Sequence, residues 1–434
     1  MSAVAEALAR IARHDPQVNA FTDVLAERAH RAPVHGPLAG MPFAAKNLFD
    51  MKGIPTRAGS KIRRTAPPAT ADATLVARME AAGAICVGAL NMDEFAYGFT
   101  TENTHDGPCR NPHDLTRIAG GSSGGSGAAV AAGMVPVSLG TDTNGSIRVP
   151  ASLCGIFGIK PTYGRLPRTG ATLFVAALDH VGPFARDVAT LAAVYDVLQG
   201  PDPADPAQVP MPVEPVSPGL EAGLDGLRIA RLGGWFDGPQ TAAARQAVAA
   251  VGKALRAAGP VVWADAEATR AAAFLITSSE GAGFRLPELR SHLEDFEPLT
   301  QDRLLAGALL PAAWIFQAQR VRAMGQASMK ALLADWDILI APATPTPATP
   351  IGQEMLTMEG VTMPLRPSMG LYTQPISAIG LPVLTVPLQN VDGPLPIGVQ
   401  LIGRPWGEAA LFRAARVLEQ AGVCAAPVAP AFAD

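Results

Sequence analysis

A glycine- and serine-rich segment, IAGGSSGGSGAAVAAGM at 118–134, presents several hydroxyl groups that could do chemistry. A flexible linker can have this composition, but a small-residue helix and an apolar strand follow at once, so the segment lies inside a packed unit. A phosphate-binding loop needs a lysine or a different glycine spacing after a strand. The third interpretation is an active-site loop, with Ser122 at a helix N-terminus where backbone N–H groups favour negative charge.

Ser146 lies 24 residues beyond Ser122, within LGTDTNGSIRVPASLCG. The segment VPVSLGTDT at 135–143 predicts a strand, and a tight turn should follow it. Such a turn directs several backbone N–H groups into one space, which is what an oxyanion forming on an attacked amide carbonyl requires. The residues that would supply these N–H groups are Thr143, Asn144, Gly145 and Ser146.

A serine nucleophile needs a base to take its proton. None of the seven histidines lies in a GxSxG elbow or another recognisable triad pattern. A lysine can serve if burial lowers its pKa. Lys46 is flanked by MPFAA and NLFD, which is too apolar a setting for an ordinary surface lysine. Lys160 in GIKPT is the second candidate, although a surface or structural role suits it at least as well.

The elements that must position these residues alternate between helix and strand. Helices are expected at 3–31, 71–83, 239–258, within 286–334 and at 408–421. Strands are expected at MPFAAK, AICVGAL, 135–143, 153–162, 227–234, the start of 336–350 and within 381–403. This alternation predicts an α/β fold with a mixed sheet. The proline-rich stretch 200–219 could be an inter-domain linker. A surface excursion is the preferred interpretation, because matching chemistry lies on both sides of it.

The composition sets the class of protein. With 434 residues, 48% of them apolar and 17% charged, the chain should be globular, as one large α/β unit or two smaller ones. A net charge of −4 argues against nucleic acid and against an anionic membrane surface. No apolar run approaches the roughly 18 residues of a membrane span, and the N-terminus lacks a signal-peptide core. Four cysteines without metal-ligand spacing predict buried packing residues, no metal site and a cytoplasmic setting.

Several segments together resemble the amidase signature family: AGMPFAAKNLFD, NMDEFAYGFTTEN, RNPHD, the block from AGGSSGGSG to KPTYGR, and LPIGVQLIG. The resemblance covers about 36–190 and 337–415. It implies that Ser146 is the nucleophile, that Ser122 is a bridging serine in a cis peptide and that Lys46 is the catalytic lysine. It also implies a proton relay from Ser146 through Ser122 to neutral Lys46, an acyl-enzyme, and no metal or other cofactor.

The resemblance also implies an architecture, a single amidase-signature domain over 1–434. Its core is a large twisted mixed sheet with helices on both faces, with the signature at about 36–190 and further strands and a helix at about 337–421. The N–H groups of 143–146 are expected to hold the oxyanion. Asp142 and Arg148 are expected to hold the turn in shape, and Ser123 to support its loop by hydrogen bonding. Many family members have glycine at the position of Asn144, whose side chain could narrow or polarise the pocket.

Three segments are similar to the carboxybiuret hydrolase branch of the family: TDTNGSIRVPASLCG, LDHVGPFARD and LLAGALLPAAWIFQAQRVR. Enzymes of that branch act on a small carboxylated biuret and associate with a small helical protein. Arg285, Arg320 and Arg322 could meet a substrate carboxylate, although a solvated or structural arginine is the simpler interpretation. Tyr97 and Phe174 could line the pocket or pack in the core. The apolar segment 304–318 could be an interface, with burial in the core as the default.

Two other functions remain open. A glutaminase-like component of a transamidating complex would keep the same two serines and lysine, so the motifs alone do not exclude it. A non-catalytic scaffold with the same fold is less consistent with an intact Lys46, Ser122 and Ser146. The expected partners are a small amide substrate, a second copy of the chain in a homodimer and, by the branch resemblance, a small helical accessory subunit.

Overall fold

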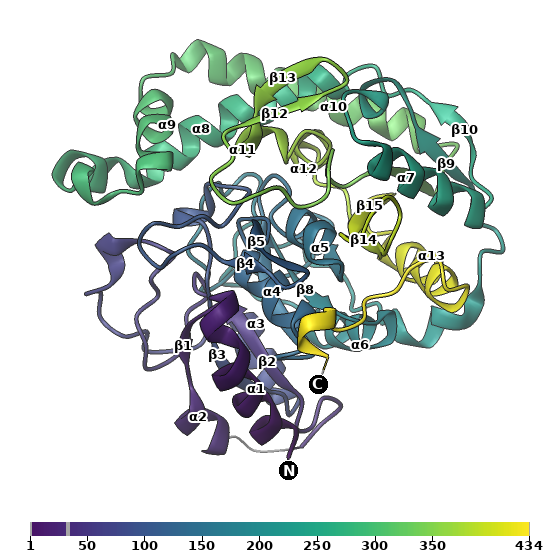
Figure 1. Ribbon diagram of the computed structural model, residues 1–434. Helices are drawn as coiled ribbons and strands as arrows, with labels where there is room; N and C mark the ends of the chain where they lie inside the picture. The colour runs from purple at the N-terminus through teal and green to yellow at the C-terminus, as the bar shows by residue number, and fades with distance from the viewer. Residues whose placement is uncertain (1, 32–34, 434) are drawn as a thin grey trace.

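The computed structural model describes residues 2–31 and 35–433 and is built around one eleven-stranded mixed sheet (Figure 1). In spatial order the strands are β1 (Phe21–Val24), β3 (Ile85–Leu90), β2 (Pro42–Lys46), β6 (Val137–Asp142), β8 (His180–Ala185), β7 (Phe157–Lys160), β14 (Val383–Leu388), β15 (Ile397–Gly403), β11 (Ile338–Pro342), β9 (Ile229–Leu232) and β10 (Ala258–Val261). β2 runs parallel to β3 and β6, whereas β8 is antiparallel to β6. The predicted α/β fold with a mixed sheet is confirmed.

The helices are α1 (Ala3–Val18), α2 (Ala26–Arg31), α3 (Thr74–Ala81), α4 (Gly124–Ala131), α5 (Arg148–Cys154), α6 (Val188–Leu198), α7 (Ala242–Ala254), α8 (Ala266–Ser291), α9 (Pro298–Ala308), α10 (Ala312–Leu332), α11 (Leu365–Ser368), α12 (Gln374–Ala378) and α13 (Glu408–Gln420). Two small hairpins are formed by β4 (Arg110–Asn111) with β5 (Asp114–Ile118), and by β12 (Met355–Met358) with β13 (Val361–Pro364). Figure 1 shows α8, α9 and α10 gathered on one side of the molecule, away from α1 and α2.

Helices cover both faces of the sheet, as contacts along β15 show. A Cβ at Gly398 would meet Ser152 on α5, whereas a Cβ at Gly403 would meet Leu411 on α13. The two glycines are five positions apart, an odd number, so their Cβ positions point to opposite faces of the strand. The central strands β2, β3, β6 and β14 are therefore buried along their whole length. This explains why they read as continuous apolar runs rather than alternating ones.

The N-terminal helix is shorter than predicted. α1 ends at Val18, and Asn19 follows with a left-handed φ of 58°. The Asp15 carboxylate accepts hydrogen bonds from the backbone N–H groups of Ala20 and Phe21, which directs the chain into β1. The expected single helix over 3–31 is therefore wrong, because local side-chain bonding by asparagine and aspartate ends the first helix early. The expected helix at 71–83 is present as α3, over Thr74–Ala81.

The apolar segment 304–318 is not the buried core helix taken as the default. α9 ends at Ala308, and α10 begins after Pro311. Leu309, Trp314 and Phe316 are 83%, 55% and 67% exposed. Their exposure overturns the core interpretation for this part of the segment.

Other expectations concern burial and membranes. Cys86 and Cys154 are free and buried, which confirms them as packing residues, and Cys109 and Cys424 are free and buried as well. Within residues 2–31 and 35–433, no helix combines the length and apolarity that crossing a bilayer requires.

Candidate active site

Lys46 is the last residue of β2 and is completely buried. Its Nζ donates hydrogen bonds to Ser122 Oγ at 2.7 Å and to Thr141 Oγ1 at 2.8 Å. β2 and β6 are parallel neighbours, so Lys46 and Thr141 emerge at the same end of adjacent strands. The lysine predicted from its apolar neighbours thus lies beside one of the two predicted serines.

The protonation state of Lys46 is set by its surroundings. Burial disfavours the ammonium ion, and this effect is larger than the opposing attraction of Asp93, Asp179 and Asp142. The net result lowers the pKa of Lys46 to about 7. At neutral pH a large share of the molecules therefore hold a neutral amine that can accept a proton.

Ser122 follows a cis peptide bond between Gly121 and Ser122, just before α4. Gly121 has no room for a side chain, because a Cβ there would collide with the Asp93 carboxylate and the Thr100 amide. The neighbouring Ser123 donates through Oγ to Thr141 O at 3.1 Å, and its Oγ accepts from Thr141 N at 3.3 Å. These bonds tie the serine loop to β6.

Ser146 lies in the turn between β6 and α5 and is 2% exposed. Gly145 has a φ of +142°, and a Cβ on it would collide with Thr373 Oγ1. Among the described residues, the backbone N–H groups of 143–146 have no hydrogen-bond acceptor. A turn with unoccupied N–H groups beside a serine hydroxyl is suited to stabilise an oxyanion.

A completely buried ion pair holds this turn. Arg148 Nε and Nη2 lie 2.9 Å from the two carboxylate oxygens of Asp142, in a fork geometry. Arg148 Nη1 also donates to Thr373 O at 3.0 Å and to Gln400 Oε1 at 2.7 Å, and Nη2 to Ser377 Oγ. Burial alone would raise the pKa of Asp142, but the charge and hydrogen bonds of Arg148 outweigh it and hold that pKa well below its usual range.

Residues of the turn form hydrogen bonds with residues of other elements. Thr143 Oγ1 donates to Asp179 Oδ1 at 2.6 Å. Asn144 Nδ2 donates to Thr277 Oγ1 on α8 at 2.8 Å, and its backbone carbonyl accepts from Thr373 Oγ1 at 2.6 Å. Asn144 thus connects the turn to α8.

The second lysine, Lys160, occupies a different setting. It is also buried, but its Nζ donates to the backbone carbonyls of Pro161, at 3.3 Å, and of Leu381. Burial lowers its pKa, and the nearby Arg148 lowers it further. Carbonyl partners indicate a structural role, so the geometry favours Lys46 as the base.

The three arginines considered for a substrate carboxylate do not converge. Arg285 lies over the Phe95 ring at 4.6 Å and pairs with Glu288 at 3.3 Å. Arg322 donates to the backbone carbonyls of Ala378 and Ala177, and Arg320 is exposed. Each is therefore solvated or engaged in local structure.

The two aromatic residues considered for the pocket pack together, with the Tyr97 and Phe174 ring centroids 4.7 Å apart. Phe174 also lines a small cavity of about 10 Å³, which it shares with Thr141, Thr143 and Asp179. That is room for about one water molecule. Both aromatic residues are thus core residues next to the site.

Sequence reasoning missed several residues of the site. Thr141 contacts Lys46, Asp179 and Thr277 hold the turn, and Asp93 lies against Gly121. Asp93 and Asp179 stand in segments that carried the family resemblance, so proximity to those motifs was the available signal. Thr277 lies more than a hundred residues away, where the sequence gives no signal.

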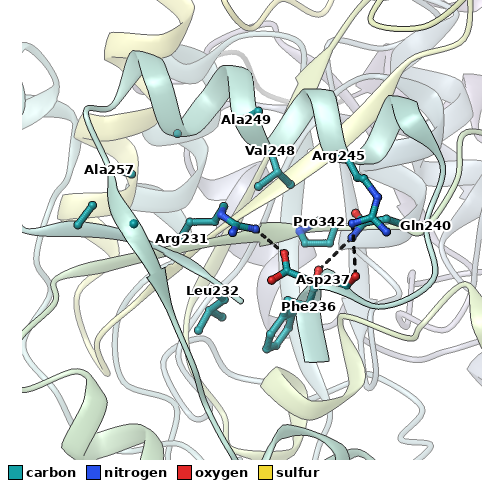
Figure 2. A pocket seen from close by; sticks show the side chains of 13 residues that line it. Arg231, Leu232, Phe236, Asp237, Gln240, Arg245, Val248, Ala249, Ala257 and Pro342 are labelled. Carbon is teal, nitrogen blue, oxygen red and sulfur yellow. Dashed lines mark hydrogen bonds and ion pairs between the residues drawn. The ribbon is translucent and has the colours of Figure 1, made fainter. Parts of the chain in front are cut away.

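A separate hollow of about 520 Å³ lies beside β9 and α7 (Figure 2). Its arginines already have partners: Arg231 pairs with Asp237, and Arg245 donates to the backbone carbonyls of Asp237 and Gly238. β9 lies seven strand positions from β2, which is about 34 Å across the sheet. This hollow therefore takes no part in the Lys46 site.

Comparisons with known proteins agree with this geometry. A family model described as amidase matches residues 2–412. AtzE, a subunit of the 1-carboxybiuret hydrolase of Pseudomonas sp. (strain ADP), is 55% identical over 96% of this chain and 94% of its own length. A subunit of the glutamyl-tRNA(Gln) amidotransferase of Anaeromyxobacter sp. (strain K) is 38% identical over 98% of this chain and 94% of its own length.

Solved structures show the same fold. One, of a vestigial protein complex that reveals the evolutionary origins of an s-triazine catabolic enzyme, matches with a TM-score of 0.95 and 54% identity, over 97% of this chain and 95% of that chain. The corresponding glutamyl-tRNA(Gln) amidotransferase chain of Thermotoga maritima matches with a TM-score of 0.84 and 32% identity, over 96% and 90% of the two chains.

Proposed function

The chain belongs to the amidase signature family, and from that premise we propose that it hydrolyses the C–N amide bond of a small carboxylated substrate of the 1-carboxybiuret type. The observation that carries the chemistry is the buried hydrogen bond from Lys46 to Ser122, next to a turn whose N–H groups have no acceptor among the described residues. The support for the substrate is the 55% identity to a 1-carboxybiuret hydrolase chain over almost the whole sequence.

The proposed first half-reaction forms an acyl-enzyme. Neutral Lys46 takes the hydroxyl proton of Ser122, which takes the proton of Ser146 as its oxygen attacks the amide carbonyl. The carbonyl oxygen becomes an oxyanion that accepts hydrogen bonds from the N–H groups of the 143–146 turn. As the C–N bond breaks, the relay runs in reverse and delivers a proton to the leaving nitrogen. Ammonia departs, and the acyl group stays on Ser146 as an ester.

The second half-reaction is hydrolysis of that ester. Water attacks the ester carbonyl and gives its proton to the same relay. The second oxyanion occupies the same turn, and its collapse breaks the bond to Ser146, whose oxygen regains a proton. The Asp142–Arg148 pair acts through the turn, since the Ile147 amide donates to Asp142 and Arg148 donates to the Thr373 carbonyl, which holds the backbone that carries the N–H groups. No metal or other cofactor enters these steps.

The first experiment is an ammonia-release assay with the purified protein. The panel comprises 1-carboxybiuret, biuret, allophanate, malonamate, glutamine and an aryl amide, each with wild type and Ser146→Ala. Release from 1-carboxybiuret that disappears in the variant is the expected result. Ammonia release from another amide alone would mean that this amide, and not 1-carboxybiuret, is the substrate. Ammonia release that survives Ser146→Ala would refute Ser146 as the nucleophile.

A second function is that of a glutaminase-like component of a transamidating complex, favoured by the 38% identity to a glutamyl-tRNA(Gln) amidotransferase chain. Glutamine hydrolysis together with recovery of a tRNA-bound partner would support it. Glutamine turnover far below that of 1-carboxybiuret would exclude it.

We also propose that the chain works in the cytoplasm as a homodimer, together with a small helical accessory subunit. The exposed Leu309, Trp314 and Phe316 at the α9–α10 junction support an interface there. A match to a solved protein complex supports a partner protein. Light scattering of the purified chain would give its oligomeric state directly.

A further inference from the structure

A cleft of about 500 Å³ lies where α8 and α9 meet the segment around β12, β13 and α11. Its lining includes Phe274, Leu299, Arg303, Pro364, Arg366 and Pro367. Two arginines in a largely apolar cleft are an unusual combination, because a guanidinium near apolar walls needs an anionic or hydrogen-bonding partner.

Arg366 lacks partners for part of its guanidinium. Its side chain is 15% exposed, and Nη2 lies 3.3 Å from Asp93 Oδ1. Its Nε and Nη1 atoms are buried and have no hydrogen-bond acceptor in the described part of the chain. Buried charged donors are costly to leave unpaired, so these two N–H positions call for an acceptor from outside the chain.

Arg303 supplies a second cation at the same cleft. Its guanidinium lies 3.7 Å from the centroid of the Tyr97 ring, and Nη1 donates to the Tyr97 carbonyl at 3.3 Å. Burial lowers the pKa of Arg303, and repulsion from Arg366 acts in the same direction. The two cations are thus close enough to disfavour each other, which an added anion would relieve.

The acids that line the cleft do not complete the pairing. Glu354 is exposed to solvent, and Glu102 is half-buried with its Oε1 accepting from the Gly352 amide at 2.6 Å. Asp93 is shared, because its other oxygen accepts from the Thr101 amide at 3.1 Å. Within the described residues, Nε and Nη1 of Arg366 are therefore left without an acceptor at the inner wall of the cleft.

The cleft is connected to the serine loop through Asp93. The Asp93 amide donates to the Ser122 carbonyl at 3.2 Å, and its carboxylate lies against Gly121. On the other side, Phe99 packs between Gly145 of the turn and Gly370, which follows α11. A group bound at Arg366 is therefore one side chain removed from the loop that carries Ser122.

We infer that Arg366, with Arg303 beside it, binds the carboxylate of the substrate and selects anionic amides over neutral ones. The fork of a guanidinium matches the two oxygens of a carboxylate, and the apolar walls strengthen that interaction. This inference rests on the proposed amidase function and names the residues that give it substrate specificity. It replaces Arg285, Arg320 and Arg322 as candidates for that contact.

The test measures binding and turnover separately. In a Ser146→Ala background, calorimetry compares malonamate, which carries a carboxylate, with malonamide, its neutral counterpart. Arg366→Met should weaken malonamate binding about 100-fold or more and change malonamide binding less than about twofold. Arg320→Met, which removes an exposed arginine from α10, should change neither. In the active enzyme, Arg366→Met should raise KM for the carboxylated substrate more than it lowers kcat.

Three outcomes would overturn the inference. The first is that Arg366→Met weakens malonamate and malonamide binding equally, which would mean that Arg366 only positions Asp93. The second is that Arg366→Met leaves malonamate binding unchanged. The third is that Arg320→Met weakens malonamate binding as much as Arg366→Met does. If Arg366→Met does not fold, Arg366→Lys is the second variant. It keeps the charge but loses the forked guanidinium, and it should still weaken malonamate binding about tenfold. Arg366-dependent malonamate binding in a protein that hydrolyses none of the panel would refute the proposed function and leave the anion site standing.

Discussion

The side-chain nitrogen of Lys46 lies 2.7 Å from the hydroxyl oxygen of Ser122, and both side chains are completely buried. A lysine in that position is costly to keep charged, which is why its pKa falls to about 7. Burial therefore sets the pH range in which Lys46 can accept a proton, and the short distance makes Ser122 the nearest hydroxyl to give one. This contact and the turn beside it can be tested in four ways.

The first prediction concerns pH. Only neutral Lys46 can accept a proton, so kcat/KM should rise about tenfold per pH unit below pH 7 and level off above it. The measurement is the ammonia-release rate between pH 5.5 and 9. A rate that is flat from pH 5.5 to 8, or that falls with rising pH in this range, would contradict Lys46 as the base.

The second prediction separates the catalytic serines from a structural one. Ser122→Ala and Ser146→Ala should each lower kcat by at least about 10³-fold, and the double variant should lose little more, because the relay acts as a unit. Ser126→Ala is the matched control, since Ser126 is equally buried in the same segment and its Oγ donates to Leu139 O at 3.0 Å. A comparable loss in Ser126→Ala would show that the segment is sensitive to any change.

The third prediction concerns the buried ion pair. Arg148→Met leaves the Asp142 carboxylate buried without its partner and should lower the free energy of unfolding by about 3–5 kcal/mol. Urea denaturation measures this. Because the pKa of Asp142 is held below its unfolded value, the contribution of the pair is complete above about pH 4 and declines as the pH falls.

Arg231→Met provides the control for that pair. Arg231 and Asp237 are 33% and 40% exposed, so their ion pair is screened by solvent. Its removal should change the free energy of unfolding by less than about 1 kcal/mol. Equal effects of the two substitutions would show that burial does not increase the contribution of the Asp142–Arg148 pair to the free energy of unfolding.

The fourth prediction concerns the turn. Gly145→Ala should abolish most activity, because its φ of +142° disfavours a side chain and the new Cβ would collide with Thr373 Oγ1. The assay is kcat/KM alongside the melting temperature. Gly252→Ala is the control: it lies in α7, its Cβ would come no closer than 4.0 Å to Ala257, and it should stabilise the protein by about 0.5–1 kcal/mol. Full activity in Gly145→Ala would show that the turn does not require the backbone conformation of glycine at this position.

The sequence by itself determined the α/β class and the residues from which the site is built. Lys46 was identifiable because a lysine between apolar strand residues must be buried, and the central strands were identifiable because burial on both faces leaves continuous apolar runs. Ser122 and Ser146 were identifiable because their glycine-rich surroundings suit neither a linker nor a phosphate loop. Their catalytic roles remain predictions until the variants are measured.

Only the tertiary structure decided which distant residues complete the site. Thr277 reaches Asn144, and Arg366 reaches Asp93, across more than a hundred residues of chain. It also decided that Trp314 and Phe316 are exposed, although their sequence is as apolar as a core helix. Apolar patterning and motif spacing describe a residue's neighbours along the chain. Burial, pairing and pKa depend on what the folded chain brings against it from elsewhere.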